Sequence, residues 1–371
     1  MKIQWFAIAL SWFAIAGNVW SEDPASTLDE SFAAILALDK NAGVGADQSR
    51  PMAAWKKIAD VPAKNLPLVL GQMKGTGPIA ENWLRAAADT IAERQLARGG
   101  ELPQADLERF VLSRSESPRA RRVAFEWVEH VDKTARARLI PKLLDDPSLE
   151  LRYDAVAGEI ARAKGLEGPA AVAVYQKAFR AARDLDQVKQ CAEALKKLET
   201  PVNVADHFGF ITDWHLIGAF NNKNRAGYAK KMPPEKELDL SAEYQGLDKN
   251  IAWTQHRTDQ QEGEVDLNKV FGEIKEVLAY AAGEITVDAD RGAQIRINCV
   301  TACKVWLNGR LVIDHEVYHA GYRFDQYTAN VRLKKGRNTI LVKCCQNEQT
   351  ESWTNVWKFA LRVCDELGGR L

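Results

Sequence analysis

The feature that most constrains the fold is a change of hydrophobic period near Pro201. From about Ser26 to Thr200, apolar residues recur at spacings of three and four, which predicts amphipathic helices. Beyond Pro201, short runs alternate apolar with polar residues and are rich in aromatic and β-branched side chains, which predicts strands of an antiparallel β-sandwich. We therefore expect a multidomain α plus β fold. The predicted strands are Phe210–Ile217, Glu276–Ala281, Ala293–Cys299, Cys303–Leu307, Leu311–Asp314, Arg323–Tyr327, Ala329–Leu333, Asn338–Cys344 and Trp357–Val363.

The N-terminal residues are predicted to form a signal peptide. Lys2 is followed by the apolar run Ile3–Ala16, and cleavage after Ala16 or Ser21 would fit the small residues there. The run has about 14 residues, fewer than the roughly 20 needed to cross a bilayer, although a retained N-terminal anchor is an alternative. We expect an exported protein, periplasmic or extracellular, with no membrane association after cleavage. The predicted domains are a signal peptide at 1–21, a helical domain at 22–200 and a β domain at 201–371.

The charge balance argues against dedicated nucleic-acid binding. The 371 residues include 50 Lys and Arg and 50 Asp and Glu, so the formal net charge is +0. Neither half of the chain carries the excess of basic residues that would neutralise phosphates. We therefore expect partners other than DNA or RNA.

The cysteines are unevenly distributed. Cys191 is alone in the helical half, and the other five lie in the last third of the chain. In an exported protein Cys299 and Cys303 could bridge a short loop, whereas Cys344 and Cys345 are predicted to point to opposite faces of a strand. Buried free thiols are the alternative. Zinc binding by cysteines is not favoured, because no Cys-x-x-Cys pair occurs.

A weak repeat runs through the helical half. The pattern Arg-x-x-Ala recurs at Arg85, Arg121 and Arg152, at intervals of 36 and 31 residues. Its best copy, Leu139–Val156, contains an Asp-Asp-Pro turn between two predicted helices and resembles a HEAT repeat. In that family the Asp-Pro turn joins antiparallel helices, the Ala allows close approach, and the Arg ties neighbouring turns together. The resemblance implies an α-helical solenoid whose groove binds an exported protein partner; a helical spacer is the alternative.

Two motifs characterise the last third of the chain. In Lys304–Val312, Asn308-Gly309 suits a type I′ turn between two alternating strands. In Leu333–Lys343, Gly336 predicts a tight turn before a mostly buried strand. Together they resemble the galactose-binding-like β-jelly-roll domains appended to bacterial glycoside hydrolases, over roughly residues 207–364. The resemblance implies a jelly roll that contacts carbohydrate or is purely adhesive, without catalysis.

The same resemblance suggests where a ligand would bind. Sugar sites of that family lie on loops at one end of the sandwich, where an aromatic face stacks on a pyranose ring. We expect a non-catalytic glycan-binding protein with a helical scaffold and no cofactor; a protein interaction scaffold without sugar binding is the alternative. Packing at the edge of the fold is the other interpretation of each aromatic residue. The candidate ligand-binding residues are Trp253, His256, Arg257, Tyr318, His319, Tyr322 and Trp353.

His315–His319 matches H-E-x-x-H, in which two His bind zinc and the Glu activates water. That chemistry requires a helix, because only then do both imidazoles face one way. The turn at Asn308-Gly309 and the strand-like residues after it predict an extended segment instead. The two imidazoles would then be about 13 Å apart, too far for one metal ion. A zinc metallohydrolase acting through His315, Glu316 and His319 is therefore the least favoured hypothesis.

Overall fold

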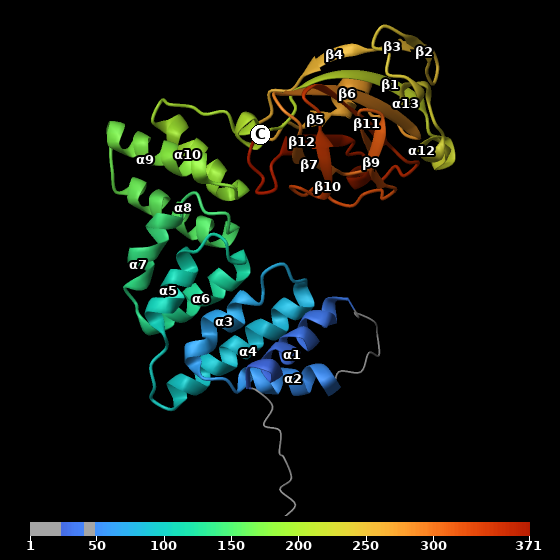
Figure 1. The fold of residues 1–371 in the computed structure, drawn as a ribbon. Helices are drawn as coiled ribbons and strands as arrows, with labels where there is room; N and C mark the ends of the chain where they lie inside the picture. Colours follow the sequence, from blue (N-terminus) through green and yellow to red (C-terminus); the bar gives the residue numbers. More distant parts are fainter. Residues whose placement is uncertain (1–23, 41–48) are drawn as a thin grey trace, which may run out of the picture. The chain divides into compact units, whose positions relative to one another are not determined.

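The computed structural model describes residues 24–40 and 49–371. The predicted signal peptide, residues 1–21, lies outside this range. The chain divides into two compact units, Met1–Ala135 and Arg136–Leu371. Helices come first and strands follow, and the change falls between α11 (Val204–Phe208) and β1 (Asp213–Asn221) (Figure 1). The prediction of N-terminal helices followed by antiparallel sheets is confirmed.

The first unit is helical. Apolar residues line the inner faces of its helices at helical spacing, as Leu84, Ala88 and Ile91 do on α4, each 0% exposed. Pro78 and Pro118 begin helices, where a missing N–H costs nothing because the first turn has no partner for it. Its helices are α1 (Pro24–Leu36), α2 (Ser49–Ala59), α3 (Leu66–Gly71), α4 (Pro78–Ala97), α5 (Gln104–Leu112) and α6 (Pro118–Val131). Within the ranges described, none of the chain's helices combines the length and the apolar character needed to span a membrane.

Two of the three repeated arginines are buried. Arg121 donates from Nε to the carbonyl oxygen of Val111 at 2.7 Å, and Arg152 donates from Nε to that of Asp146 at 2.7 Å. Each arginine thus provides a hydrogen-bond donor for a backbone carbonyl oxygen near the end of a preceding element. Arg85 differs, since it is about half exposed and pairs with surface carboxylates.

The second unit contains both helices and sheets. Ser148 and Asp184 cap α8 and α10 by accepting hydrogen bonds from backbone N–H groups of the first turn. These helices share a hydrophobic cluster with Phe210 and with Ala360 on β12, so they pack directly against a sheet. Its helices before the first strand are α8 (Leu149–Lys164), α9 (Gly168–Ala181), α10 (Leu185–Lys197) and α11; α7 (Ala135–Leu139) lies at the division between the units.

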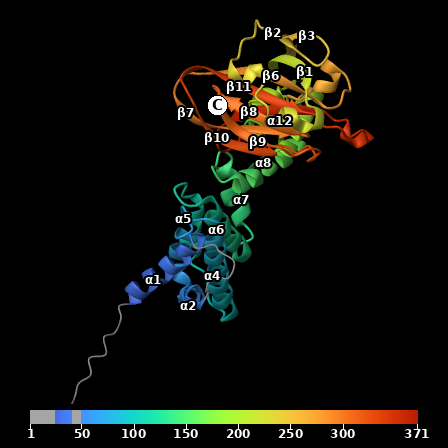
Figure 2. The same ribbon diagram turned by 90° about the vertical axis from the view of Figure 1, so that its right-hand side faces the viewer.

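The strands form two large antiparallel sheets, seen from two sides in Figures 1 and 2. The six-stranded sheet has the order β4-β1-β6-β11-β8-β9, and the four-stranded sheet has the order β10-β7-β12-β5. A small third sheet pairs β2 with β3. We call residues 213–364 the β-sheet module. After β1, its strands are β2 (Glu243–Gln245), β3 (Asn250–Ala252), β4 (Thr254–Arg257), β5 (Val265–Asp266), β6 (Val277–Val287), β7 (Arg291–Cys299), β8 (Ala302–Leu307), β9 (Arg310–His315), β10 (Tyr327–Leu333), β11 (Gly336–Cys345) and β12 (Lys358–Cys364).

The two large sheets share one hydrophobic core. Residues of both sheets alternate into it, for example Ile295 and Ile297 from β7 and Val305 from β8. Cys344 belongs to this core, whereas Cys345 belongs to a second cluster on the outer face of the six-stranded sheet, as predicted.

All six cysteines are free and buried, so the alternative of buried thiols describes the structure. Cys303 lies directly opposite Cys344 across two strands, and the Sγ atoms of Cys299 and Cys344 are 3.9 Å apart. Burial raises the pKa of the Cys344 thiol well above its ordinary value.

The predicted turns are confirmed, and one predicted strand is wrong. Asn308 and Gly309 have φ values of 50° and 79° between β8 and β9, as a type I′ turn requires, and Gly336 has φ 88° at the start of β11. The expected strand Arg323–Tyr327 is a loop up to Tyr327. Its chain turns at Asp325, which has φ 56° and whose carboxylate accepts bonds from arginines of two neighbouring strands.

A covering segment, residues 223–252, folds over the outer face of the six-stranded sheet. It contains α12 (Ala226–Ala229), α13 (Pro233–Lys236) and the small sheet, and its Tyr228 and Met232 join the outer cluster. Lys343 on β11 points into this layer with a fully buried side chain. Its ammonium group donates to the carbonyl oxygens of Tyr228 and Lys230, each at 3.0 Å, and to Glu235 at 2.7 Å.

Candidate functional site

Three of the seven candidate ligand-binding residues come together at one end of the β-sheet module. The antiparallel pairing brings the ends of β1, β9 and β11 to the same end of the six-stranded sheet. Tyr318 and His319 lie on the loop after β9, and Trp353 lies on the loop after β11. We call Arg225, Tyr318, His319, Asn347 and Trp353 the loop-end site.

Trp353 is the most exposed large hydrophobic residue described. It lies on η5 (Ser352–Thr354), and its side chain is 62% exposed. The ring of His319 meets it edge to face, with centroids 5.2 Å apart and planes at 76°. This contact occupies only one side of the residue, so most of the indole surface remains open to solvent.

Polar side chains also lie at this end of the module. His319 Nε2 lies 3.1 Å from Asn347 Oδ1, an acceptor, so Nε2 is the nitrogen that carries the proton. The Arg225 guanidinium lies 5.1 Å from the centre of the Tyr318 ring, and it also pairs with the exposed Glu348.

Protonation states at the loop-end site follow from these contacts. Burial raises the pKa of Tyr318 to about 12, so this phenol stays neutral and keeps its proton at physiological pH. The hydrogen bond from Arg225 lowers the pKa of Glu348, which is therefore ionised. The site therefore offers a neutral phenol beside the ion pair of Arg225 and Glu348.

The loops at this site hold uncommon backbone conformations. Asn224, Arg225 and His319 have φ values of 55°, 62° and 57°, in the left-handed region that residues other than glycine rarely adopt. Side-chain contacts of Arg225 and His319 accompany these conformations. Residues held in such conformations concentrate at binding sites, where they fix the direction of side chains.

The other four candidate residues lie elsewhere. Trp253 packs against the outer cluster of the six-stranded sheet, beside the covering segment. His256 and Arg257 lie on the edge strand β4, where Arg257 pairs with Asp213 at 3.3 Å. The ring of Tyr322 is half buried, with Lys358 Nζ 4.4 Å from its centre.

Sequence reasoning did not single out Arg225 and Asn347. A signal for both exists in the polar residues beyond two predicted strands. Arg225 ends a polar run that begins at Asn221, a few residues after Phe210–Ile217, and Asn347 lies three residues after Asn338–Cys344. Polar residues directly after buried strands mark the loop end of a sandwich.

The H-E-x-x-H segment is not helical, as expected. β9 ends at His315, and Glu316–His319 form a loop. The ring of His315 stacks on Tyr327 with centroids 4.0 Å apart, whereas His319 contacts Asn347 and Trp353. Across the residues that the structure describes, no group of three His, Cys, Asp or Glu side chains is arranged to hold a metal ion.

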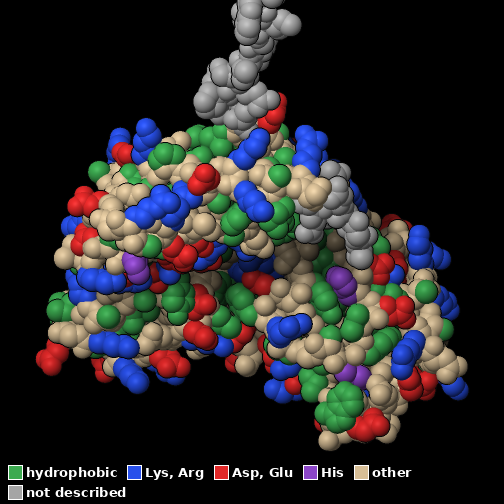
Figure 3. All heavy atoms as spheres, turned by 90° about the horizontal axis from the view of Figure 1, so that it is seen from below, with side chains coloured by type: hydrophobic (Ala, Val, Ile, Leu, Met, Phe, Trp, Pro, Cys, Tyr) green, Lys and Arg blue, Asp and Glu red, His purple; other side chains and the backbone are tan. Residues whose placement is uncertain are grey.

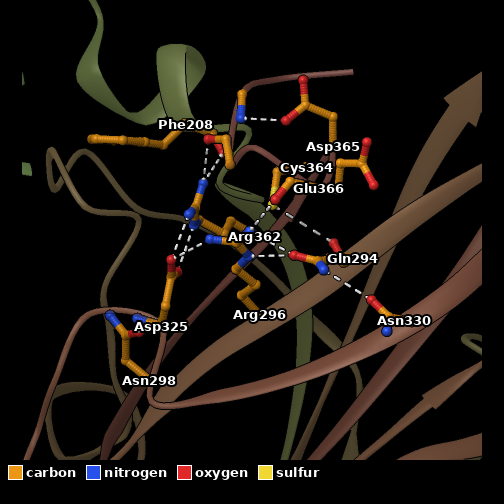
Figure 4. A network of polar contacts seen from close by, with 12 residues as sticks. Phe208, Gln294, Arg296, Asn298, Asp325, Asn330, Arg362, Cys364, Asp365 and Glu366 are labelled. Atoms are coloured by element: carbon orange, nitrogen blue, oxygen red, sulfur yellow. Dashed lines mark hydrogen bonds and ion pairs between the residues drawn. The ribbon is translucent and has the colours of Figure 1, made fainter. Parts of the chain in front are cut away.

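A second polar network covers the outer face of the four-stranded sheet (Figure 4). Asp325 accepts from Arg296 Nη1 at 2.6 Å and from Arg362 Nη2 at 2.6 Å, and Arg362 also donates to the carbonyl oxygens of Phe208 and Gly368. Burial would raise the pKa of Asp325, but its bonds to Arg362 and Arg296 outweigh burial and lower it. Because Arg362 is only 1% exposed, this network serves to join α11, the loop at Asp325 and the C-terminal residues.

The surface carries both signs of charge. On the face shown in Figure 3, Lys and Arg side chains are interspersed with Asp and Glu, and no broad field of one sign is visible. This agrees with the even balance of 50 basic and 50 acidic residues in the sequence.

Comparison with known proteins gives only distant likenesses. No family model matches the chain, and no curated protein matches it in sequence. Among solved structures, it is similar to an anti-sigma factor domain-containing protein (14% identity, TM-score 0.25, 43% of each chain). It is also similar to a GH2 beta-galacturonidase from Eisenbergiella tayi (10%, 0.23, 41% of this chain and 23% of that one) and a family 35 carbohydrate binding module from Clostridium thermocellum (19%, 0.16, 24% and 78%). The chain spans less than half of the first two, and TM-scores below 0.5 establish neither a shared fold nor a shared function.

Proposed function

We propose that this chain is an exported, non-catalytic protein that binds a glycan at the loop-end site. The observation that carries the proposal is the indole of Trp353, 62% exposed among hydrogen-bonding side chains. Pyranose rings present an apolar face that stacks on such a ring, while their hydroxyl groups need donors and acceptors. The exposed pair of Arg225 and Glu348, beside Tyr318, supplies such groups at the same end of the module. The buried Asn347 holds the ring of His319 against the indole.

The proposal includes the finer architecture implied by the sequence. We infer that the two large sheets form a jelly roll of the galactose-binding-like kind and that the helices form a HEAT-like solenoid. The shared core of the two sheets supports the first inference. The buried arginines Arg121 and Arg152, each bound to a carbonyl of a preceding turn, support the second.

The absence of catalysis is also part of the proposal. His315 and His319 are engaged by different neighbours, so they do not share the helical face that a zinc peptidase motif requires. Assays for glycan hydrolysis and for peptide hydrolysis, each with added zinc, test this part. Turnover that is lost in His315→Ala would contradict it.

The direct test is binding of the full chain to a panel of soluble and insoluble polysaccharides. We expect saturable binding to one glycan class, and Trp353→Ala should weaken it about tenfold or more because stacking and apolar burial are lost together. Trp353→Phe keeps a ring and should retain most of the affinity.

Leu247→Ala is the matched control, because Leu247 is an exposed apolar residue of the module, 41% exposed, outside the loop-end site. Circular dichroism of each variant checks that the fold is intact. Binding that is equal in Trp353→Ala and in the unsubstituted chain would place the glycan elsewhere, and no binding across the panel would refute the proposed function.

A further inference from the structure

The two edge strands β9 and β10 border a groove. Each strand pairs with one neighbour only, β9 with β8 and β10 with β7, so each forms the edge of its sheet. The edges meet where His315 stacks on Tyr327, with ring centroids 4.0 Å apart. Toward the Asn308-Gly309 turn they border a cavity of about 760 Å³. Figures 1 and 2 both show β9 and β10 next to each other at this side of the β-sheet module.

The groove combines an aliphatic floor with free strand edges. Leu311, Val312 and Val331 line it, and Leu311 is 41% exposed although it is apolar. Its described lining contains no aromatic ring, so it lacks the stacking surface that a sugar ring prefers. An edge strand instead presents unpaired backbone N–H and C=O groups, which bind another extended chain.

The rim of the groove is positively charged. Arg310, Arg332 and Lys334 line it, all three are exposed, and none forms an ion pair with a residue that the structure describes. The one carboxylate in the lining, Asp290, accepts a hydrogen bond from the backbone N–H of Lys335 at 2.8 Å. Three cations against one carboxylate leave an excess of positive charge, which favours an acidic occupant.

We propose that this groove binds an extended acidic segment of a partner protein. The segment adds to the edge of β9 or β10 through backbone hydrogen bonds, places alternate apolar side chains on the aliphatic floor and directs its carboxylates to Arg310, Arg332 and Lys334. The cavity volume lies within the range of pockets that hold ligands. This site is separate from the loop-end site, and neither proposal requires the other.

The test measures fluorescence anisotropy of a labelled decapeptide of alternating glutamate and valine, titrated with the full chain. We expect saturable binding that weakens as salt is raised. The double variant Arg310→Glu/Arg332→Glu should bind about tenfold more weakly or worse, because two attractions become repulsions. The double variant Lys231→Glu/Lys236→Glu, an equal charge change at two exposed residues of the covering segment outside the groove, should bind as the unsubstituted chain does.

Two further peptides test the ligand's charge and its backbone hydrogen bonding separately. A lysine and valine decapeptide, and a glutamate and valine decapeptide methylated on every backbone nitrogen, should both fail to bind. Equal binding of either one, or absence of saturable binding by the parent peptide, would overturn the proposal. Tighter binding of oligogalacturonate at the same cations would overturn it in favour of an acidic glycan. Trp353→Ala should leave the affinity for the peptide unchanged. A failure of peptide binding in the groove can therefore be distinguished from a failure of glycan binding at the loop-end site.

Discussion

At the scale of single residues, His207 shows how burial fixes a charge state. Its ring lies between Phe179 and Phe208, with centroids 4.5 and 5.1 Å away. One ring nitrogen, Nε2, lies 2.9 Å from the carbonyl oxygen of Ala182 and therefore carries the proton. Burial lowers the pKa of His207 to about 4, so the folded protein holds a neutral imidazole well below neutral pH.

This lowered pKa predicts a pH-dependent stability. The unfolded chain takes up a proton near pH 6.5, whereas the folded chain resists it down to about pH 4. The contribution to the free energy of unfolding is thus fully present above about pH 6.5 and is lost as pH falls through about 4, by about 2 to 3 kcal/mol at pH 4.5.

We expect His207→Gln, which can still donate to Ala182, to lose less stability between pH 7 and pH 4.5 than the unsubstituted chain. Urea unfolding at both pH values measures the difference. A pH dependence equal to that of the unsubstituted chain would show that His207 is not the responsible group.

At the scale of elements, the covering segment depends on one strand residue. Lys343 extends from the centre of the six-stranded sheet and binds two carbonyl oxygens and a carboxylate of this segment. The Tyr280 hydroxyl also donates to Glu235, and burial raises the pKa of Tyr280, which keeps it protonated as a donor. The side chains of Lys343 and Glu235 are only 0% and 7% exposed, so each charge depends on the other.

We predict that Lys343→Met lowers the free energy of unfolding by about 3 to 5 kcal/mol, because it leaves a buried carboxylate without its cation. The double variant Lys343→Met/Glu235→Gln should lose less than the sum of the two single variants. Chemical denaturation of all four proteins measures this coupling.

Arg337→Met is the control for this cycle, since Arg337 and Glu284 form an exposed pair with side chains 69% and 45% exposed. We expect it to change stability by less than about 1 kcal/mol. Additive single and double variants at Lys343 and Glu235 would contradict the coupling.

At this scale, some features of the fold could be predicted from the sequence and others could not. The hairpin at Asn308-Gly309 follows from local φ preferences, and the opposite orientation of Cys344 and Cys345 follows from strand alternation. The burial of Lys343 could not be predicted, because its partners come from a segment more than a hundred residues earlier. Hydrophobic periodicity and turns can be predicted from the local sequence, whereas the burial of a charged side chain depends on distant parts of the chain.

The candidate site shows the same limit. Aromatic residues on predicted loops identified Tyr318, His319 and Trp353, which do meet. The same criterion also selected Trp253, which lies against the covering segment, and Tyr322, which lies under Lys358. An aromatic residue on a loop looks the same in sequence whether it faces solvent or packs against a neighbouring element.

At the scale of the whole molecule, the change from helical to strand-like hydrophobic period does not coincide with the boundary between the two compact units. The period changes near Pro201, but the second compact unit begins at Arg136. The reason is the cluster in which α8 to α11 pack against Phe210 and Ala360. These helices and the β-sheet module bury one shared apolar surface, which favours cooperative unfolding.

We predict that a fragment from Arg136 to Leu371 folds alone and unfolds in one transition. A fragment from Pro201 to Leu371 should melt at a lower temperature, because removing α8 to α10 exposes Phe208, Phe210 and Ala360. Thermal unfolding followed by circular dichroism compares the two. Equal melting temperatures would support the predicted domain boundary at residue 200 instead.

The six unlinked thiols have a consequence for where this chain can reach its native state. No covalent bridge closes any part of the structure described, so the native state does not need an oxidant to form. A cell could complete this fold in a reducing compartment or in an oxidising one. In an oxidising compartment, incorrect disulfides can form before the chain collapses, while its sulfur atoms are exposed. Enclosure of Cys299, Cys303 and Cys344 by the two sheets then protects these thiols from oxidation.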